Sequence, residues 1–326
     1  KLNENPIWHP LPPRPRAIMQ ASHPLLPPSH ATTLVTSHPL LPAEERKRQR
    51  CALFSSGSIY DHESLAFTHL PKAGGSSLQQ MLTSEAKRHN RSVMNVHTLG
   101  SGRLGAGSPE ATAALQEADV LVGHGSYQYM VDYLRWRPRA TFVTLLRQPS
   151  DRLESLFRYR GGDGEAYARR EIAQGRSLQA EYDDYLRRLD MDTTALNMHR
   201  PKATCADADV ADASGHFLFC RGALSAAQVE ATVDFMRARY AVVGVLERQS
   251  DTMEVLRCRV PWVEAAAFPQ VNANAQTWHY PVQLHADAAA MLNATFLEDQ
   301  LYARANELLT EDLECCRRQG PRPTVA

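Results

Sequence analysis

Short apolar runs occur along the chain from about residue 60 onward, and stretches of helical periodicity separate them. Five of these runs have the length and the largely β-branched or aromatic content that are typical of strands. We therefore expect five strands, at residues 65–70, 119–124, 141–147, 216–220 and 240–247.

Between the apolar runs, hydrophobic residues recur at intervals of three or four, which predicts amphipathic helices. A longer stretch of the same kind, residues 297–316, closes the chain. Strands that alternate with helices pair in parallel through right-handed crossovers, so the pattern predicts an α/β fold: a three-layer sandwich with a central parallel sheet. The periodic positions are Leu78, Met81, Leu82 and Ala86, then Leu153, Leu156 and Phe157, then Val229, Val233 and Met236.

The first fifty residues differ in composition from the rest. They hold half of the chain's prolines, and the segment SHPLLP occurs twice, at residues 22–27 and 37–42. Proline removes backbone donors and blocks helices, so this region cannot build a packed core. We predict a disordered stalk or linker over residues 1–59, one folded domain over residues 60–318 and a flexible tail over residues 319–326.

The 326-residue chain has 36 basic and 36 acidic side chains. This balance gives no argument for binding nucleic acid or an anionic membrane, so affinity for an anion has to come from a local site. No run of about eighteen apolar residues occurs, and the chain as given is therefore expected to contain no transmembrane helix. No spacing of cysteines and histidines is typical of a zinc site.

The six cysteines leave two interpretations open. Cys205 and Cys220 bracket a polar loop, and a disulfide between them would remove denatured-state entropy worth roughly 3 kcal/mol. The alternative is a set of reduced, partly buried thiols. Two glycosylation sequons, at Asn90 and Asn293, favour a secretory compartment.

The segment FTHLPKAGGSS, residues 67–77, lies where the first apolar run ends and a helix begins. In an open parallel sheet, ligands bind beyond the carboxyl ends of the strands. Gly74 and Gly75 allow the backbone to turn sharply, and the N–H groups of the first helical turn favour an anion. Lys72 adds a positive charge, and the two serines after the glycines add hydroxyl donors. The alternative is a glycine-rich turn with a surface lysine.

The same loop does not match a Walker A motif. In that motif the lysine directly follows the last glycine, whereas here it precedes both glycines. A nucleotide kinase is therefore a disfavoured interpretation.

A second strand end repeats the arrangement of cation and helix start. In TFVTLLRQPSDRLESLFRYR, Arg147 ends an apolar run, Pro149 stands near the start of a helix, and Ser155 follows eight residues after the arginine. A guanidinium matches a phosphate bidentately, and the serine would close on the same group. Two anion sites on neighbouring strands suggest a ligand with two separated phosphate-like groups.

These motifs resemble those of sulfotransferases that use 3′-phosphoadenosine-5′-phosphosulfate (PAPS), in particular the Golgi heparan sulfate 2-O- and 6-O-sulfotransferases. THLPKAGGSSL is similar to the family's phosphosulfate loop, VTLLRQPSDRLESLF to its 3′-phosphate motif, and GHGSYQY to the histidine segment of the 2-O-enzymes. The resemblance covers roughly residues 64–313 and extends to YAVVGVLERQSDTMEVL, FPQVNAN and DQLYARANELL. Gln148 stands where the family often has aspartate and Ala73 where threonine is usual, which weakens assignment of the acceptor by analogy.

The resemblance implies the sulfotransferase fold, with a P-loop-like phosphosulfate loop, and roles for single residues. Lys72 would stabilise charge on the oxygen that bridges sulfur and the departing phosphate. His124, at the end of a predicted strand, would take the acceptor's proton. A histidine that is hydrogen-bonded within a loop is the alternative. The cofactor-binding residues would be Lys72, Ala73, Gly74, Gly75, Ser76, Ser77, Arg147 and Ser155.

Five basic residues are candidates for contact with an acidic sugar. His199, Arg200 and Lys202 belong to one segment, for which a solvated loop is the alternative. Arg158 and Arg160 lie about one helical turn beyond Ser155 and would touch the nucleotide or the acceptor.

Four further side chains have simpler expected roles. Arg152 and Glu154 are expected to be surface charges of a helix. Trp262 and Trp278 would form a sugar-stacking wall or, as the alternative, pack in the core.

The resulting hypothesis is an O-sulfotransferase that moves the sulfuryl group of PAPS to a hydroxyl of a glycan or polysaccharide, without a metal and without a nucleic-acid partner. The resemblance implies a place in the Golgi lumen, held by a single-pass type II anchor that precedes this chain. The alternatives are a sulfotransferase for a small alcohol, a phenol or protein tyrosine, and a catalytically silent glycan-binding module on the same fold.

Overall fold

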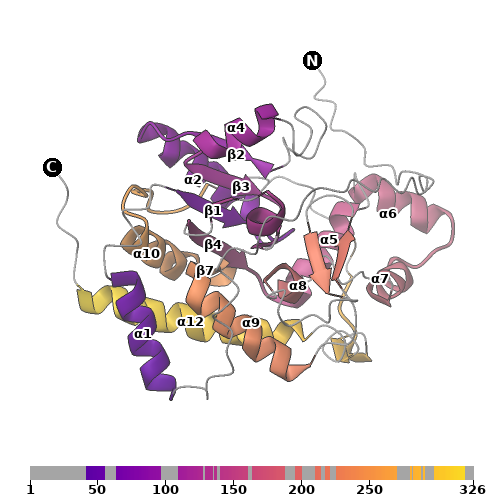
Figure 1. Ribbon diagram of the computed structural model, residues 1–326. Coiled ribbons are helices and arrows are strands. Elements are labelled where there is room, and N and C mark those ends of the chain that lie inside the picture. Colours follow the sequence, from indigo (N-terminus) through magenta and orange to yellow (C-terminus); the bar gives the residue numbers. More distant parts are fainter. Residues whose placement is uncertain are drawn as a thin grey trace. The chain divides into compact units, whose positions relative to one another are not determined.

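The computed structural model describes residues 42–55, 64–96, 109–127, 129–134, 136–137, 140–160, 164–187, 195–199, 210–213, 217–220, 225–269, 280, 282–287, 289–290 and 297–319 (Figure 1). All of them belong to one compact unit that begins at Pro42. The predicted stalk up to residue 41 and the predicted tail beyond residue 319 lie outside the described residues.

A five-stranded sheet forms the centre of this unit, and all of its strands are parallel. The prediction of an α/β fold around a parallel sheet is confirmed. Every residue of the four longest strands is buried, because a parallel strand that is covered on both faces has no side toward solvent. The strands follow the order β2 (Val93–Asn95), β3 (Val120–Gly123), β1 (Leu65–Thr68), β4 (Thr141–Leu146) and β7 (Tyr240–Val245).

Strand β1 lies between β3 and β4. Its last residue, Thr68, is in register with Gly123 on one side and with Thr144 on the other. Because the strands are parallel, the three loops that follow them leave from the same edge of the sheet. This edge brings together the segments that carry Lys72, His124 and Arg147.

Helices cover the sheet, as expected for a three-layer sandwich (Figure 1). Helix α2 (Gly75–Arg88) contacts β2 and β3. Helices α9 (Ala226–Arg239), α10 (Gln249–Arg259) and α12 (Glu298–Gln319) contact β7. The remaining short elements are the π-helix η2 (Tyr129–Tyr133), the 3₁₀-helix η6 (Leu246–Arg248) and α8 (Ala195–His199). Helix α4 (Pro109–Glu117) precedes β3 in the chain.

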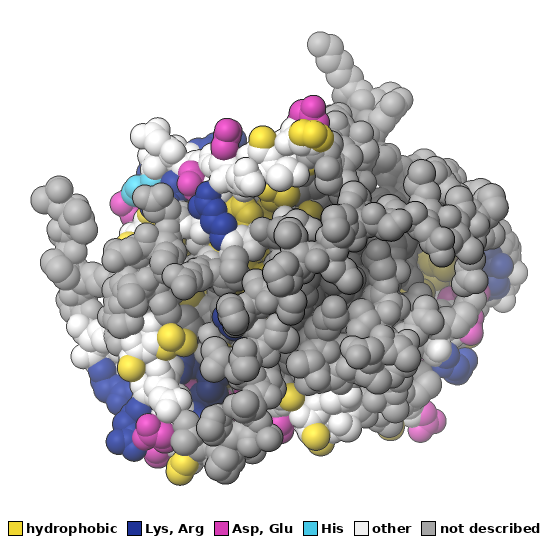
Figure 2. Space-filling view, viewed as in Figure 1, with side chains coloured by type: hydrophobic (Ala, Val, Ile, Leu, Met, Phe, Trp, Pro, Cys, Tyr) yellow, Lys and Arg dark blue, Asp and Glu magenta, His cyan; other side chains and the backbone are white. Residues whose placement is uncertain are grey.

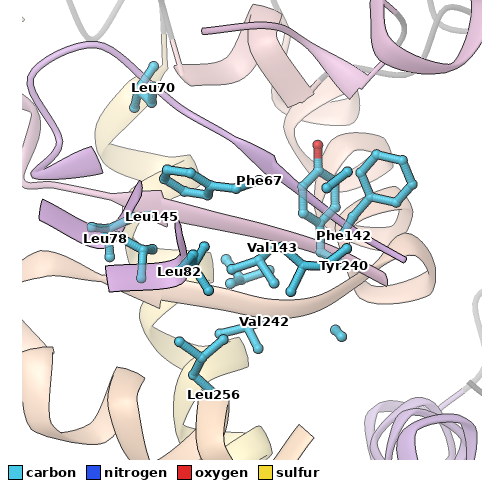
Figure 3. Packing of buried hydrophobic residues seen from close by; sticks show 14 of the residues in the cluster. Phe67, Leu70, Leu78, Leu82, Phe142, Val143, Leu145, Tyr240, Val242 and Leu256 are labelled. Atoms are coloured by element: carbon cyan, nitrogen blue, oxygen red, sulfur yellow. The ribbon is translucent and has the colours of Figure 1, made fainter. Parts of the chain in front are cut away.

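The main hydrophobic core forms between the sheet and these helices. Figure 3 shows apolar side chains from β1, β4 and β7 that meet leucines of α2 and α10. The predicted apolar positions of α2 and α9 are all buried, which confirms their helical periodicity. These positions are Leu78, Met81, Leu82, Ala86, Val229, Val233 and Met236.

The apolar run at residues 216–220 does not join the central sheet. It forms β6 (Phe217–Cys220), which pairs antiparallel with β5 (Val210–Ala213) in a separate two-stranded sheet. Only residues 214–216 connect the two strands, and a connection this short cannot make the crossover that parallel pairing needs. The expectation that this run is a parallel strand was therefore wrong.

Residues 43–55, which the sequence analysis included in the stalk, form helix α1 (Ala43–Ser55). Arg50 of this helix is buried and pairs with Asp312 of α12 at 2.6 Å. Cys51, the next residue, is joined to Cys315 of α12 by a disulfide. Helix α1 is thus attached through an ion pair and a covalent bond rather than through an apolar stripe, which hydrophobic periodicity does not reveal.

A second disulfide joins Cys258 of α10 to Cys316 of α12, with the two Cα atoms 5.9 Å apart. The corresponding Cα distance for Cys51 and Cys315 is 5.6 Å. Sequence analysis did not identify either pairing. The predicted bond between Cys205 and Cys220 involves side chains outside the described part of the chain.

A smaller hydrophobic cluster lies apart from the main core. Helices α5 (Pro149–Arg160), α6 (Gly164–Ala173) and α7 (Leu178–Arg187) build it together with Val282. The inward positions of α5, which are Leu153, Leu156 and Phe157, belong to this cluster and not to the one against the sheet. Helix α5 therefore packs chiefly on α7 and α12 instead of lying over the sheet as an ordinary crossover helix would.

The packing of α5 corrects the expectation that Arg152 is a surface charge. Arg152 is completely buried, and its guanidinium donates to both carboxylate oxygens of Glu298 at 2.6 and 2.7 Å. Glu154 is half-buried and pairs with Arg158. Among the described residues, no helix is both long enough and apolar enough to span a membrane.

Candidate functional site

The loop between β1 and α2 has an unusual backbone. Lys72 and Gly74 both adopt the left-handed conformation, with φ of 64° and 77°. This conformation is uncommon for a residue with a Cβ atom, so the position of Lys72 is a strained one of the kind that clusters at functional sites. Gly74 is the N-cap of α2 and supplies no side-chain cap, which leaves first-turn N–H groups of the helix without a side-chain acceptor.

Gly75, the first residue of α2, lies directly against the ring of His69. A Cβ atom at this position would stand 1.9 Å from the Cδ2 atom of His69, so only glycine fits under the ring. At Gly74 a Cβ atom would meet Leu246 at 2.6 Å. The two glycines therefore make room for the ring of His69 and for the side chain of Leu246 at the start of the helix.

Lys72 and Arg147 bring two positive charges to the ends of neighbouring strands. The Nη1 atom of Arg147 donates to the carbonyl oxygen of Lys72 at 3.3 Å. Burial lowers the pKa of the Lys72 ammonium group, and the charge of Arg147 lowers it further. The carboxylate of Asp151 lies 4.0 Å from Arg147, at the limit of an ion pair. An anion between the two cations would relieve this repulsion, so the arrangement is that of an anion site.

Where Figure 2 colours charged side chains, basic and acidic residues occur near one another. The chain as a whole has a net charge of zero. The attraction for an anion therefore depends on local geometry, as the composition predicts.

His124 follows β3 at the same edge of the sheet. Its Nδ1 atom lies 2.8 Å from the carbonyl oxygen of His69. A carbonyl oxygen only accepts hydrogen bonds, so Nδ1 carries the proton and Nε2 of the neutral ring keeps its lone pair. The ring of His124 also stacks on that of His69, with 3.8 Å between the centroids. His124 is thus held with the basic nitrogen on its Nε2 side.

The remaining predicted cofactor-binding residues surround the same loop. Ala73 is buried, Ser76 is exposed and Ser77 is half-buried at the start of α2. Ser155 is half-buried on α5. Within the described part of the chain no hydrogen bond joins Ser155 to Arg147, so the prediction that the two residues bind one phosphate rests on sequence alone.

His199 is buried in the protein instead of facing an acceptor. Its Nδ1 atom donates to the carbonyl oxygen of Ala195 at 2.7 Å, and its Nε2 atom lies 2.8 Å from the hydroxyl of Thr144. Burial lowers the pKa of His199 to about 4, against a small upward effect of the Ala195 bond. The candidate role in substrate binding does not fit this position, and the side chain instead supports the end of β4. Arg200 and Lys202 lie outside the described residues.

Other candidates lie farther from the loop or are already paired. The charge of Arg158 is engaged by Glu154, and the side chain of Arg160 is not among those described. Trp262 packs against the main core, and the guanidinium of Arg91 lies 5.4 Å from its ring. Arg91 follows the C-terminal end of α2, at the opposite end of that helix from the glycine loop, so Trp262 does not border the anion site. Trp278 is outside the described residues.

Of the two predicted glycosylation sequons, the structure describes only the one at Asn90. Asn90 is exposed in a left-handed turn after α2, with φ of 53°. Asn293 lies outside the described residues.

Two residues at the site were missed by sequence reasoning. The ring of Tyr159, on α5, lies 4.4 Å from the Nζ atom of Lys72. Glu247, in η6, accepts from the backbone N–H of Gln148 at 3.0 Å and from the hydroxyl of Tyr302 at 2.9 Å. Both contacts join segments that are distant in sequence, and no local motif marks them. In the described ranges, no cluster of three histidine, cysteine or acidic side chains is arranged to hold a metal.

Comparison with known proteins adds no relative. A scan against protein-family models finds no match, and a search of curated proteins finds no similar sequence. The function is therefore inferred from the residues and the geometry described above.

Proposed function

We propose that this protein is a sulfotransferase that moves the sulfuryl group of PAPS to a hydroxyl group of a glycan or polysaccharide. The observation that carries the proposal is the contact between Lys72 and Arg147 at the ends of two adjacent parallel strands. Beside it lie a helix start without a side-chain cap and, on the third strand, a histidine with one fixed proton. The resemblance of both strand-end motifs to those of PAPS-dependent enzymes supports the same reading.

The site suits a donor with several anionic groups. Gly74 and Gly75 begin α2 at the positive end of its dipole, and Gly74 leaves first-turn N–H groups without a side-chain cap. Lys72 would hold the 5′-phosphosulfate at this helix start, and Arg147 would hold the 3′-phosphate bidentately with help from Ser155. A bound anion would also favour the charged form of Lys72, against the burial and the neighbouring charge that lower its pKa.

PAPS supplies a sulfuryl group attached to a good leaving group, a phosphate. The Nε2 atom of His124 would take the proton of the acceptor hydroxyl as its oxygen forms a bond to sulfur. The bond between sulfur and the bridging phosphate oxygen breaks, and that oxygen keeps the electron pair. Lys72 would stabilise the charge that develops on it, and 3′-phosphoadenosine-5′-phosphate would leave.

The covalent structure is compatible with a secretory compartment. Two disulfides join α1 and α10 to α12, and such bonds persist mainly in oxidising environments. This supports the proposed place in the Golgi lumen, where a glycan acceptor would be met.

The test is transfer of radiolabelled sulfate from PAPS to desulfated heparin, desulfated dermatan and simple phenols. The wild type is compared with Lys72→Ala and His124→Ala. Lys87→Ala is the matched control for the lysine, because Lys87 is an exposed lysine on α2 at the end far from the glycine loop. His89→Ala, at an exposed histidine, is the control for His124.

We expect label on a polysaccharide with the wild type and both controls. Lys72→Ala and His124→Ala should each lower kcat by about 10²-fold or more, the range for loss of one charge-stabilising or proton-transferring group. Label on phenols alone would move the proposal to the small-acceptor alternative. Full activity of Lys72→Ala would refute the assigned chemistry.

A further inference from the structure

Tyr159 contacts Lys72 and is also largely exposed to solvent. The centroid of its ring lies 4.4 Å from the Nζ atom of Lys72, a cation–π contact, and the residue is 66% exposed. The other large hydrophobic side chains that stand out from the described surface are less exposed, Ile172 at 47% and Leu53 at 40%. The ammonium group of Lys72 lies over one face of the ring, and the exposure of the residue leaves other ring surface open to solvent beside the site of the proposed transfer.

Helix α5 holds this ring on a rigid support. Leu153, Leu156 and Phe157 anchor the helix in the smaller hydrophobic cluster, and Arg152 locks it to Glu298 through a buried ion pair. Tyr159 takes no part in that cluster, and its ring is instead a cation–π partner of Lys72. A ring presented from a fixed helix can position a ligand more accurately than one on a loop.

The openness of the ring indicates which acceptor it suits. A pocket for a small phenol would enclose most of its ligand, whereas a polymer that passes over the surface needs an exposed platform. Aromatic rings carry a large apolar face, and Tyr adds a polar tip that tolerates water. A sugar ring offers an apolar face of C–H groups that can lie flat on such a platform while its hydroxyls point elsewhere.

We propose that Tyr159 is an acceptor-contact residue: its ring stacks on a sugar ring of the polysaccharide and directs a hydroxyl toward Lys72 and His124. This inference rests on the proposed sulfotransferase function and adds the residue that positions its acceptor. Stacking on the acceptor contributes to binding of the polysaccharide and not to binding of the donor.

The test compares wild type, Tyr159→Ala and Tyr159→Phe with Ile172→Ala. Ile172 is a matched control because it is an exposed apolar residue on the neighbouring helix α6. Steady-state kinetics with desulfated heparin and desulfated dermatan would give kcat and the KM of each acceptor. Calorimetric titration of the same polysaccharides into protein saturated with 3′-phosphoadenosine-5′-phosphate would measure acceptor binding without turnover.

Tyr159→Ala is expected to raise the acceptor KM and the calorimetric Kd about tenfold, or ~1.4 kcal/mol, as expected for loss of one aromatic contact. Tyr159→Phe and Ile172→Ala should keep the wild-type values, and the Kd of PAPS should be unchanged in all three variants.

An unchanged acceptor KM and Kd in Tyr159→Ala would overturn the inference, and so would a loss in Tyr159→Phe equal to that in Tyr159→Ala. These outcomes are distinct from failure of the proposed function, in which the wild type itself would transfer no sulfate to any acceptor.

Discussion

At the scale of single residues, the site depends on a few side chains whose surroundings leave them little freedom. Gly75 has no room for a Cβ atom under the ring of His69, and the carbonyl of His69 fixes the proton of His124. Lys72 is held in a left-handed backbone conformation next to a second cation. The paired cations favour a bound anion, and the His69 carbonyl fixes which ring nitrogen of a neutral His124 can accept a proton.

His199 gives a prediction for the pH dependence of stability. Its pKa falls from the ordinary value of 6.5 to about 4 in the folded protein, because the ring is completely buried. Between these two pH values the unfolded chain binds more protons than the folded one. The contribution of His199 to the free energy of unfolding is therefore complete above pH 6.5 and is lost as the pH falls toward 4, by about 3 kcal/mol in total.

Chemical denaturation of wild type and His199→Gln at several pH values from 4 to 7 would measure this effect. The difference in unfolding free energy between the two proteins should shrink as the pH falls. A difference that stays constant over the whole range would show that His199 titrates normally.

At the scale of elements, α12 is the helix to which α1 and α10 are linked by ion pairs and disulfides. Asp312 is fully buried and accepts from Arg50 of α1 and from Arg259 of α10, both at 2.6 Å. The disulfides from Cys315 and Cys316 join the same two helices to α12. Ionic and covalent links thus coincide at one stretch of α12.

Removal of the shared carboxylate should be costly. Asp312→Ala would remove the carboxylate that pairs with two buried guanidinium groups, and we expect a loss of about 3–5 kcal/mol of unfolding free energy. Glu314→Ala is the matched control on the same helix, since it removes an exposed partner of Lys47 and should change the stability little. Thermal melts of both variants with the disulfides intact would measure the difference, and equal melting temperatures would contradict the structural role of Asp312. If Asp312→Ala does not fold, the same measurement is made on Asp312→Asn, which keeps the size of the side chain and removes its charge.

The elements also show what sequence can and cannot predict. Strands β1, β3, β4 and β7 were predicted because each is an apolar run that is buried along its whole length. Strand β2 was missed because it has three residues and all are only half-buried at the edge of the sheet. Helix α1 was missed because its attachment comes from polar and covalent contacts with residues more than 250 positions away.

The same contrast holds for the candidate site. Lys72, Arg147 and His124 could be placed together because each follows a strand in a sheet whose parallel pairing was predictable. Tyr159 could not, because its contact with Lys72 requires α5 to leave the sheet and pack on α7. His199 was given a surface role because nothing local signals that its segment turns inward onto β4.

At the scale of the whole molecule, the fold separates stability from the proposed chemistry. The ionic and disulfide links gather on α12, whereas the cations and the histidine gather at the carboxyl edge of the sheet. The chain has a net charge of zero, so a polyanionic donor would be drawn to that edge by the local pair of cations and not by a general field. Binding of PAPS at this edge is the central claim.

Calorimetric titration of PAPS into wild type, Arg147→Ala and Arg317→Ala tests this claim most directly. Arg317 is an exposed arginine on α12 that pairs with Glu254, and it controls for a general loss of positive charge. We predict that the wild type and Arg317→Ala bind one PAPS with the same Kd. Arg147→Ala should bind at least tenfold more weakly, since hydrogen bonds to a charged group contribute roughly 1.5–3 kcal/mol. Absence of PAPS binding to the wild type, or a wild-type Kd in Arg147→Ala, would contradict the account.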